Sequence, residues 1–299
     1  MATALQIIQQ ATAELGLTVP TFVVGNTSTD TVQLLALLNS VGYELQRQHQ
    51  WQAICTEYRF TTQYLITTGV WSTAAATVTS IPTTAALSAN TWMATGTGIN
   101  QDTYISSVDS ATQVTLTQTP SAAGTAISFM KTKYTMPADY DRQIDRTNWD
   151  KSKHWEMLGP ETAQQWQYIK SGYIATGPRV RYRLLGGYFQ IWPGMTTAEY
   201  LGFEYVSKYW ALDASSVSKG SFTVDTDTCI FPDRLMVLGL KLKYREAKGF
   251  DTTAIYRDYI SQLDIAKAND AGSATLTMAP KPSSILIQPE NVPDSGYGL

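Results

Sequence analysis

The sequence is poor in the residues that usually carry catalysis, metal binding and covalent cross-links. Among its 299 residues there are two histidines, His49 and His154, and two cysteines, Cys55 and Cys229. Neither histidine has a cysteine or a second histidine at the spacing of metal ligands, so we expect no metal site. Two cysteines do not make the disulfide framework of a secreted protein, and free thiols are expected.

Long hydrophobic runs are also missing. The longest ones, such as residues 34–38 and 235–238, fall far short of the ~20 apolar residues that a membrane helix needs. The N-terminus has no basic region followed by an apolar stretch, so no signal peptide is expected. We therefore expect the chain to have no membrane partner.

Recognisable catalytic motifs are lacking as well. Residues 96–98 read Gly-Thr-Gly without the Gly-Lys-Ser/Thr of a phosphate-binding loop, so they are expected to form a turn. The carboxylate pairs Asp139 with Asp141 and Asp225 with Asp227 would suit a glycosidase, but acids two residues apart more often cap turns. We expect no catalytic residue and no cofactor, and hence a protein that is not an enzyme.

Charged residues are few and nearly balanced. They make up 16% of the chain, with 22 Lys and Arg against 25 Asp and Glu, for a formal net charge of -3. This balance gives no general reason to expect nucleic-acid binding. Aromatic residues are abundant instead, with 17 Tyr and 8 Trp, a composition that protein interfaces favour and that also fills ordinary cores.

Apolar residues at helical spacing predict several helices, each with a cap or stop residue nearby. The predicted helices cover residues 4–15, ended by Gly16; a span from Asp30 to Trp51; a short helix containing Trp166; a helix that begins at Pro232 and ends at Gly249; and a last helix capped by Asp251.

Strands are predicted in two regions. Between residues 72 and 129 there is no Lys or Arg, and apolar and polar residues alternate, which indicates a compact all-β insertion at 74–129. Elsewhere strands are predicted over 54–62, 179–185, 188–192 and 199–208, with Gly186-Gly187 as a two-residue hairpin turn.

Together these patterns predict an α+β fold with a helical bundle core. Residues 1–73 and 130–272 are expected to form this core with a short β-sheet, and residues 74–129 an inserted all-β module. Residues 273–299 are expected to be an extended C-terminal tail, because prolines interrupt its short apolar runs and it cannot build a core of its own.

Two groups of residues are candidates for contacts with partners. Arg179, Arg181 and Arg183 would share one face of a strand, where three like charges need phosphate, carboxylates or water around them. We favour protein carboxylates, because the chain as a whole is acidic. Short β-prone runs in the tail could pair with a sheet edge of a neighbouring subunit or another protein, unless the tail is simply a disordered end. The tail residues concerned are Leu276, Ile285 and Ile287.

The order of several pieces is distinctive. The chain opens with a helix ending at residues 13–16, a link through Pro20 and a second helix from Asp30 to Trp51. Later pieces are residues 136–142, the hairpin through Trp192-Pro193, the strand 203–207 and residues 231–235. In this order they resemble phage head-to-tail adaptors of the tail tubular protein A-like group, over most of residues 1–270 apart from the insertion.

The resemblance implies a structural protein of a tailed-bacteriophage virion, assembled in the host cytoplasm. It implies a homo-oligomeric ring, commonly of twelve copies, with the portal protein above it and tail or nozzle proteins below. DNA would pass through this connector without sequence specificity. Two other functions remain open: a tail component that binds a host surface glycan through exposed Trp and Tyr, and a glycan-cleaving tail enzyme.

Overall fold

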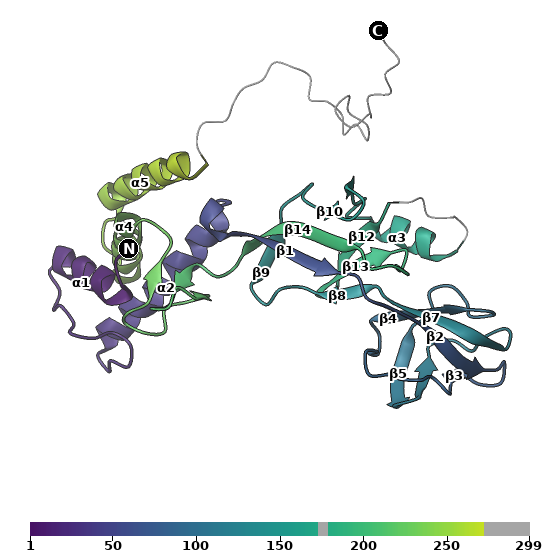
Figure 1. Ribbon diagram of the computed structural model, residues 1–299. Coiled ribbons are helices and arrows are strands. Elements are labelled where there is room, and N and C mark those ends of the chain that lie inside the picture. The colour runs from purple at the N-terminus through teal and green to yellow at the C-terminus, as the bar shows by residue number, and fades with distance from the viewer. Residues whose placement is uncertain (173–178, 272–299) are drawn as a thin grey trace, which may run out of the picture. The chain divides into compact units, whose positions relative to one another are not determined.

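The computed structural model describes residues 1–172 and 179–271. The chain divides into two compact units. The first unit comprises residues 1–56, 139–143 and the chain from Tyr205 onward, and the second comprises residues 57–138 and 144–204. Figure 1 labels the helices and strands of both units and colours them by position along the chain.

Most of the long helices belong to the first unit. They are α1 (Ala4–Leu15), α2 (Thr29–Gln48), α4 (Asp233–Lys248) and α5 (Thr253–Ala271); α3 (Ala163–Lys170) lies in the second unit, and a short 3-10 helix covers Gln52–Ile54. These positions confirm the individual helices expected from periodicity. The ends follow local chemistry: Thr3 and Gln6 form a reciprocal cap at the start of α1, and Gly16 ends it with φ of 71°.

The core of the first unit is built around α4. This helix packs against α1, α2 and α5 and is buried on most sides, as the apolar run at 235–238 predicts. Gly239 permits the close approach of α2, because a Cβ at this position would lie 2.6 Å from Val41 Cγ1. A small sheet with the order β16-β15-β17 completes the unit. Its strands are β15 (Ala211–Leu212), β16 (Ser218–Lys219) and β17 (Thr228–Cys229).

The largest sheet has five strands. Its order is β1-β14-β10-β11, with β9 also paired to β14. The strands are β1 (Cys55–Thr61), β9 (Tyr140–Gln143), β10 (Trp149–Asp150), β11 (Trp155–Glu156) and β14 (Tyr200–Ser207). The first-unit end of β14 pairs with β9, and its second-unit part pairs with β10.

A three-stranded sheet, β12-β13-β8, lies in the second unit. It contains β8 (Lys133–Thr135), β12 (Arg181–Leu185) and β13 (Tyr188–Trp192). Leu185 pairs with Tyr188 across Gly186 and Gly187, which both have positive φ, so the predicted two-residue hairpin turn is confirmed.

The alternating region of the sequence forms two further three-stranded sheets in the second unit, β2-β7-β4 and β3-β6-β5. Their strands are β2 (Tyr64–Trp71), β3 (Thr77–Val78), β4 (Trp92–Gly96), β5 (Ile105–Ser110), β6 (Gln113–Leu116) and β7 (Gly124–Lys131). They share one apolar cluster that includes Trp71, Trp92 and Phe129. Strand pairing runs from Tyr64 to Lys131, and whether residues 74–129 fold independently stays a prediction.

The prediction of a helical bundle core is wrong. The described residues hold seventeen strands and only five α-helices, and the strands form several small antiparallel sheets. Helical periodicity is a local property that identified each helix, but it does not reveal how strands far apart in the sequence pair. The predicted tail at 273–299, with Leu276, Ile285 and Ile287, lies outside the described residues.

Candidate interaction site

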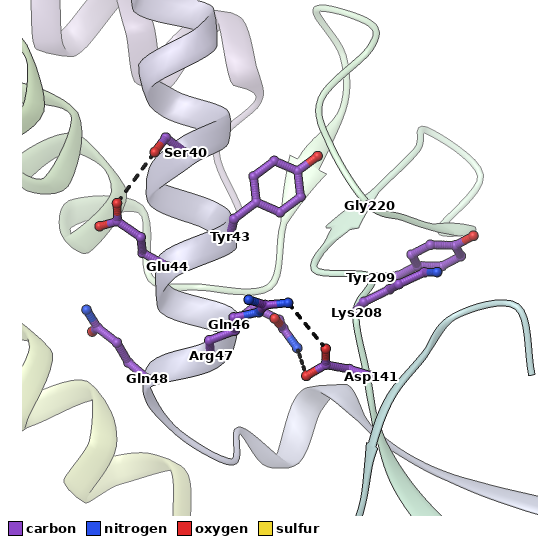
Figure 2. A pocket seen from close by; sticks show the side chains of 10 residues that line it. All are labelled: Ser40, Tyr43, Glu44, Gln46, Arg47, Gln48, Asp141, Lys208, Tyr209 and Gly220. Atoms are coloured by element: carbon purple, nitrogen blue, oxygen red, sulfur yellow. Dashed lines mark hydrogen bonds and ion pairs between the residues drawn. The ribbon is translucent and has the colours of Figure 1, made fainter. Parts of the chain in front are cut away.

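The last turns of α2 form one wall of an open pocket in the first unit. Helical spacing places Ser40, Tyr43, Glu44 and Arg47 on one side of this helix. The opposite wall comes from residues 208–209, and the pocket has a volume of about 850 Å³. Figure 2 shows these side chains, with Tyr43 projecting from α2 and Lys208 and Tyr209 from the other segment. Such a volume is large enough for a small molecule or a few peptide side chains.

Trp210 holds the tyrosine of α2 in place. Gly42 leaves room for the indole, because a Cβ at this position would lie 2.3 Å from Trp210 Cζ2. The ring of Tyr43 meets Trp210 edge-on, with centroids 5.9 Å apart and planes at 81°. Phe222 contacts Trp210 in the same manner at 4.9 Å. Tyr43 is still 50% exposed, so a rigidly supported aromatic ring faces solvent at the pocket.

Asp141 of β9 is engaged by several neighbours. Gln46 Nε2 donates to its Oδ2 at 3.2 Å and to the Ser207 carbonyl at 3.1 Å, which ties β9 and the end of β14 to α2. Arg142 donates to Asp141 Oδ2 at 3.0 Å. Arg47 Nη2 lies 3.9 Å from Asp141 Oδ1, and its side chain is 76% exposed. Asp141 therefore has its counter-charge in Arg142, and Arg47 is held only loosely.

The pocket has a surplus of positive charge. Glu44 is matched by Lys243 from α4, whose Nζ lies 2.7 Å from the carboxylate. Lys208 is exposed, and no ion pair joins it to another described residue. Because Glu44 and Asp141 each have their own cation, Arg47 and Lys208 remain to attract an anionic group beside two tyrosines.

The structure places two of the three predicted arginines in β12. Arg179 lies in a bend before β12, which begins at Arg181. Arg181 and Arg183 are on the same side of the strand. Arg181 donates to Glu161 at 2.7 Å, and the side chain of Glu161 is 9% exposed. A carboxylate of the same chain therefore meets one of the three, and their role as an interaction surface stays a prediction.

The carboxylate pairs noted in the sequence hold local structure together. Asp139 accepts a hydrogen bond from the Tyr205 hydroxyl at 2.8 Å. Asp225 accepts from backbone N–H groups of the α1–α2 loop. Asp227 accepts from Lys219 Nζ at 2.7 Å and from N–H groups of the preceding turn. Burial raises the pKa of Asp227, but these hydrogen bonds outweigh it and hold the pKa below its ordinary value.

The described part of the chain holds no cluster of three or more His, Cys, Asp or Glu residues able to bind a metal. His49 Nε2 instead lies 3.4 Å from Asp270 of α5. Cys55 and Cys229 do not form a disulfide, and burial raises the pKa of the Cys229 thiol to about 12. Across residues 1–172 and 179–271, none of the helices combines the length and apolar character that crossing a membrane requires.

The pocket was not predicted from the sequence. Tyr43 and Arg47 lie four residues apart on the polar side of a correctly predicted helix, which is how any solvated helix face looks. Nothing in the sequence links them to Lys208 and Tyr209 more than 150 residues later. Contacts of Tyr43 and Gln46 with Trp210 and the Ser207 carbonyl bring the two regions together.

A comparison with known protein families finds none that matches the chain, and a comparison with curated proteins finds no match either. The function must therefore be inferred from the order of pieces in the sequence and from the contacts within each unit.

Proposed function

We propose that this chain is a structural head-to-tail adaptor of a tailed bacteriophage, with copies arranged in a ring between the portal and the tail. The ring would surround the path of the DNA without reading its sequence. The observation that carries the proposal is that most pieces resembling the adaptor family, although far apart in the sequence, contact one another directly in the first unit.

Residues that flank the opening helices contact the piece at residues 231–235 at two places. The Ala2 N–H donates to Asp233 Oδ1 at 2.8 Å, just before α1 begins. After α2, the ring of Trp51 packs against Phe231 with centroids 5.3 Å apart. The indole Nε1 of Trp51 also donates to the Leu45 carbonyl at 2.6 Å, which fixes the turn that leaves α2.

The pieces at residues 136–142 and 203–207 meet each other and α2. Arg142 and Val206 are partners in the β9–β14 pairing. Arg142 donates to the His49 carbonyl at 3.4 Å, and Gln46 joins Asp141 to the Ser207 carbonyl. These contacts place the pieces in one compact unit, and this arrangement supports the proposal.

Binding to the portal tests the proposal. The purified chain should bind the portal ring of its own phage, and electron microscopy of the mixture should show a symmetric layer on one end of the ring. The portal of an unrelated phage is the control and should stay bare. Failure to bind the portal, together with binding or turnover of a host surface glycan, would favour the tail-component alternatives and overturn the proposal.

A further inference from the structure

The last described helix ends beside the end of α2. Asp270 accepts a hydrogen bond from the Gln52 N–H at 2.9 Å, and its carboxylate lies 3.4 Å from His49 Nε2. Gln48, which directly precedes His49, lines the pocket. The chain therefore leaves Ala271 close to the rim of the pocket described above.

The pocket offers a definite chemistry to a ligand. Arg47 and Lys208 carry charges that no neighbouring carboxylate fully matches. Tyr43 and Tyr209 add flat aromatic walls next to these cations. A peptide with acidic side chains, and with apolar or proline residues between them, fits this combination of positive charge and aromatic surface.

We propose that the pocket binds residues 288–299 of the same molecule. This segment carries Glu290 and Asp294 and contains no Lys or Arg. Its two acids can match the two surplus cations of the pocket. Pro289, Val292 and Pro293 supply apolar surface for the tyrosines, and the prolines reduce the entropy that the segment loses on binding.

The length of the connection permits this docking. Residues 272–287 lie between α5 and the proposed ligand segment, and about 3.3 Å per extended residue gives a maximum reach of about 50 Å. A tether of this kind keeps the segment at an effective concentration of about millimolar near its site. Individually weak contacts therefore suffice to keep the pocket occupied. The inference concerns the free chain and does not depend on the adaptor function.

Photo-crosslinking of the full-length chain tests the inference. With Tyr209 replaced by p-benzoylphenylalanine, irradiation should link this position to residues 288–299, as identified by mass spectrometry of the digested monomer. The yield should stay constant over about a hundred-fold range of protein concentration, because the reaction is intramolecular.

A charge exchange makes the test specific. In the chain with p-benzoylphenylalanine at position 209, R47E with K208E should lower the crosslinking yield about ten-fold. Adding E290K with D294K to this variant should restore the yield. R257E is the matched control, because Arg257 lies on α5 with its side chain 84% exposed and should leave the yield unchanged. Thermal unfolding of each variant shows whether the fold is intact.

Three results would overturn the inference. One is a crosslinking pattern that omits residues 288–299. Another is linkage found only between two molecules, with a yield that rises with concentration. The third is a failed charge exchange. Either the folded chain with R47E and K208E crosslinks as well as the unmodified sequence, or adding E290K with D294K does not restore its yield. None of these results bears on portal binding, so the two proposals fail independently.

Discussion

Gly42 determines how closely Trp210 can approach α2. Replacing a glycine inside a helix by alanine normally stabilises the helix by about 1 kcal/mol. Here the new Cβ would lie 2.3 Å from the indole ring, so we expect Gly42→Ala to reverse the sign and lower the free energy of unfolding by about 1–3 kcal/mol. Urea unfolding followed by circular dichroism measures this change.

The double variant Gly42→Ala with Trp210→Phe isolates the cause. A phenylalanine lacks the outer ring atoms that the new methyl group would meet, so the double variant should lose less stability than the sum of the single variants. The indole Nε1 is buried and finds no hydrogen-bond partner among the described residues, so its removal breaks no such bond. Strictly additive losses, or a stabilised single variant, would refute this account of the contact.

Asp227 should make the stability of the first unit depend on pH. Its pKa is lowered below 3.8 in the folded chain, so its contribution is present above the unfolded pKa and is lost as the pH falls through the folded pKa. We expect Asp227→Asn to reduce the free energy of unfolding by about 2–4 kcal/mol at neutral pH, because Lys219 loses its buried partner. The difference from the unmodified chain should shrink below about pH 4.

Denaturant unfolding over a pH series checks this prediction, with the exposed Asp264 changed to Asn as the control. The control should follow the unmodified chain closely. A difference for Asp227→Asn that stays constant down to the acid limit would contradict the assigned role of the carboxylate.

Among the secondary-structure elements, those with a strong local pattern could be predicted from the sequence. The capping box at Thr3 and the stop at Gly16 set the limits of α1, and Gly186-Gly187 sets the β12–β13 hairpin. Two-residue strands such as β10 and β15 are too short to show alternation. The pocket depends on contacts between α2 and residues 207–210, which are far apart in the sequence, so its residues could not be grouped from the sequence.

The stability of the chain should depend on Arg181 of β12 more than on Arg179, which precedes the strand. Arg181→Gln removes the partner of Glu161, whose side chain is 9% exposed, and should cost about 1–3 kcal/mol of stability. Arg179→Gln, in the bend before the strand, should change stability by less than about 0.5 kcal/mol. Thermal unfolding of the two variants compares them, and equal losses would show that the Glu161 contact is unimportant.

The all-β module at residues 74–129 is joined to the preceding strand β2 through β7. Deleting residues 74–129 removes the strand partner of β2, since Tyr64 to Thr68 pair with Ala126 to Met130 of β7. It also uncovers Trp166 and Trp192, because it removes Met93 and Tyr104 from their apolar cluster. An unpaired β2 and the uncovered tryptophans both expose apolar surface, so we expect this deletion to aggregate.

The all-β module has an apolar cluster of its own. We therefore expect an isolated chain of residues 62–133 to fold and to unfold cooperatively. Gel filtration and circular dichroism distinguish the outcomes. A soluble, folded protein after removal of 74–129 would contradict the importance of the β2–β7 pairing.

At the scale of the whole molecule, the two units differ in how much of the sequence that resembles the adaptor family they contain. The first unit gathers most of the pieces that resemble the adaptor family, so we expect it to provide the contacts to portal and neighbouring copies. The second unit carries the inserted module, which the resemblance does not cover, and the hairpin through Trp192-Pro193, which it does. The adaptor proposal thus predicts a position in the virion for the first unit above all.

Electron microscopy of the intact tailed particle tests the central claim most directly. The account predicts a ring of density immediately below the portal into which copies of the first unit fit, with α2 and α4 resolved as packed rods. Density for this chain at a tail fibre or at the tail tip, with a different protein forming the layer beneath the portal, would contradict it.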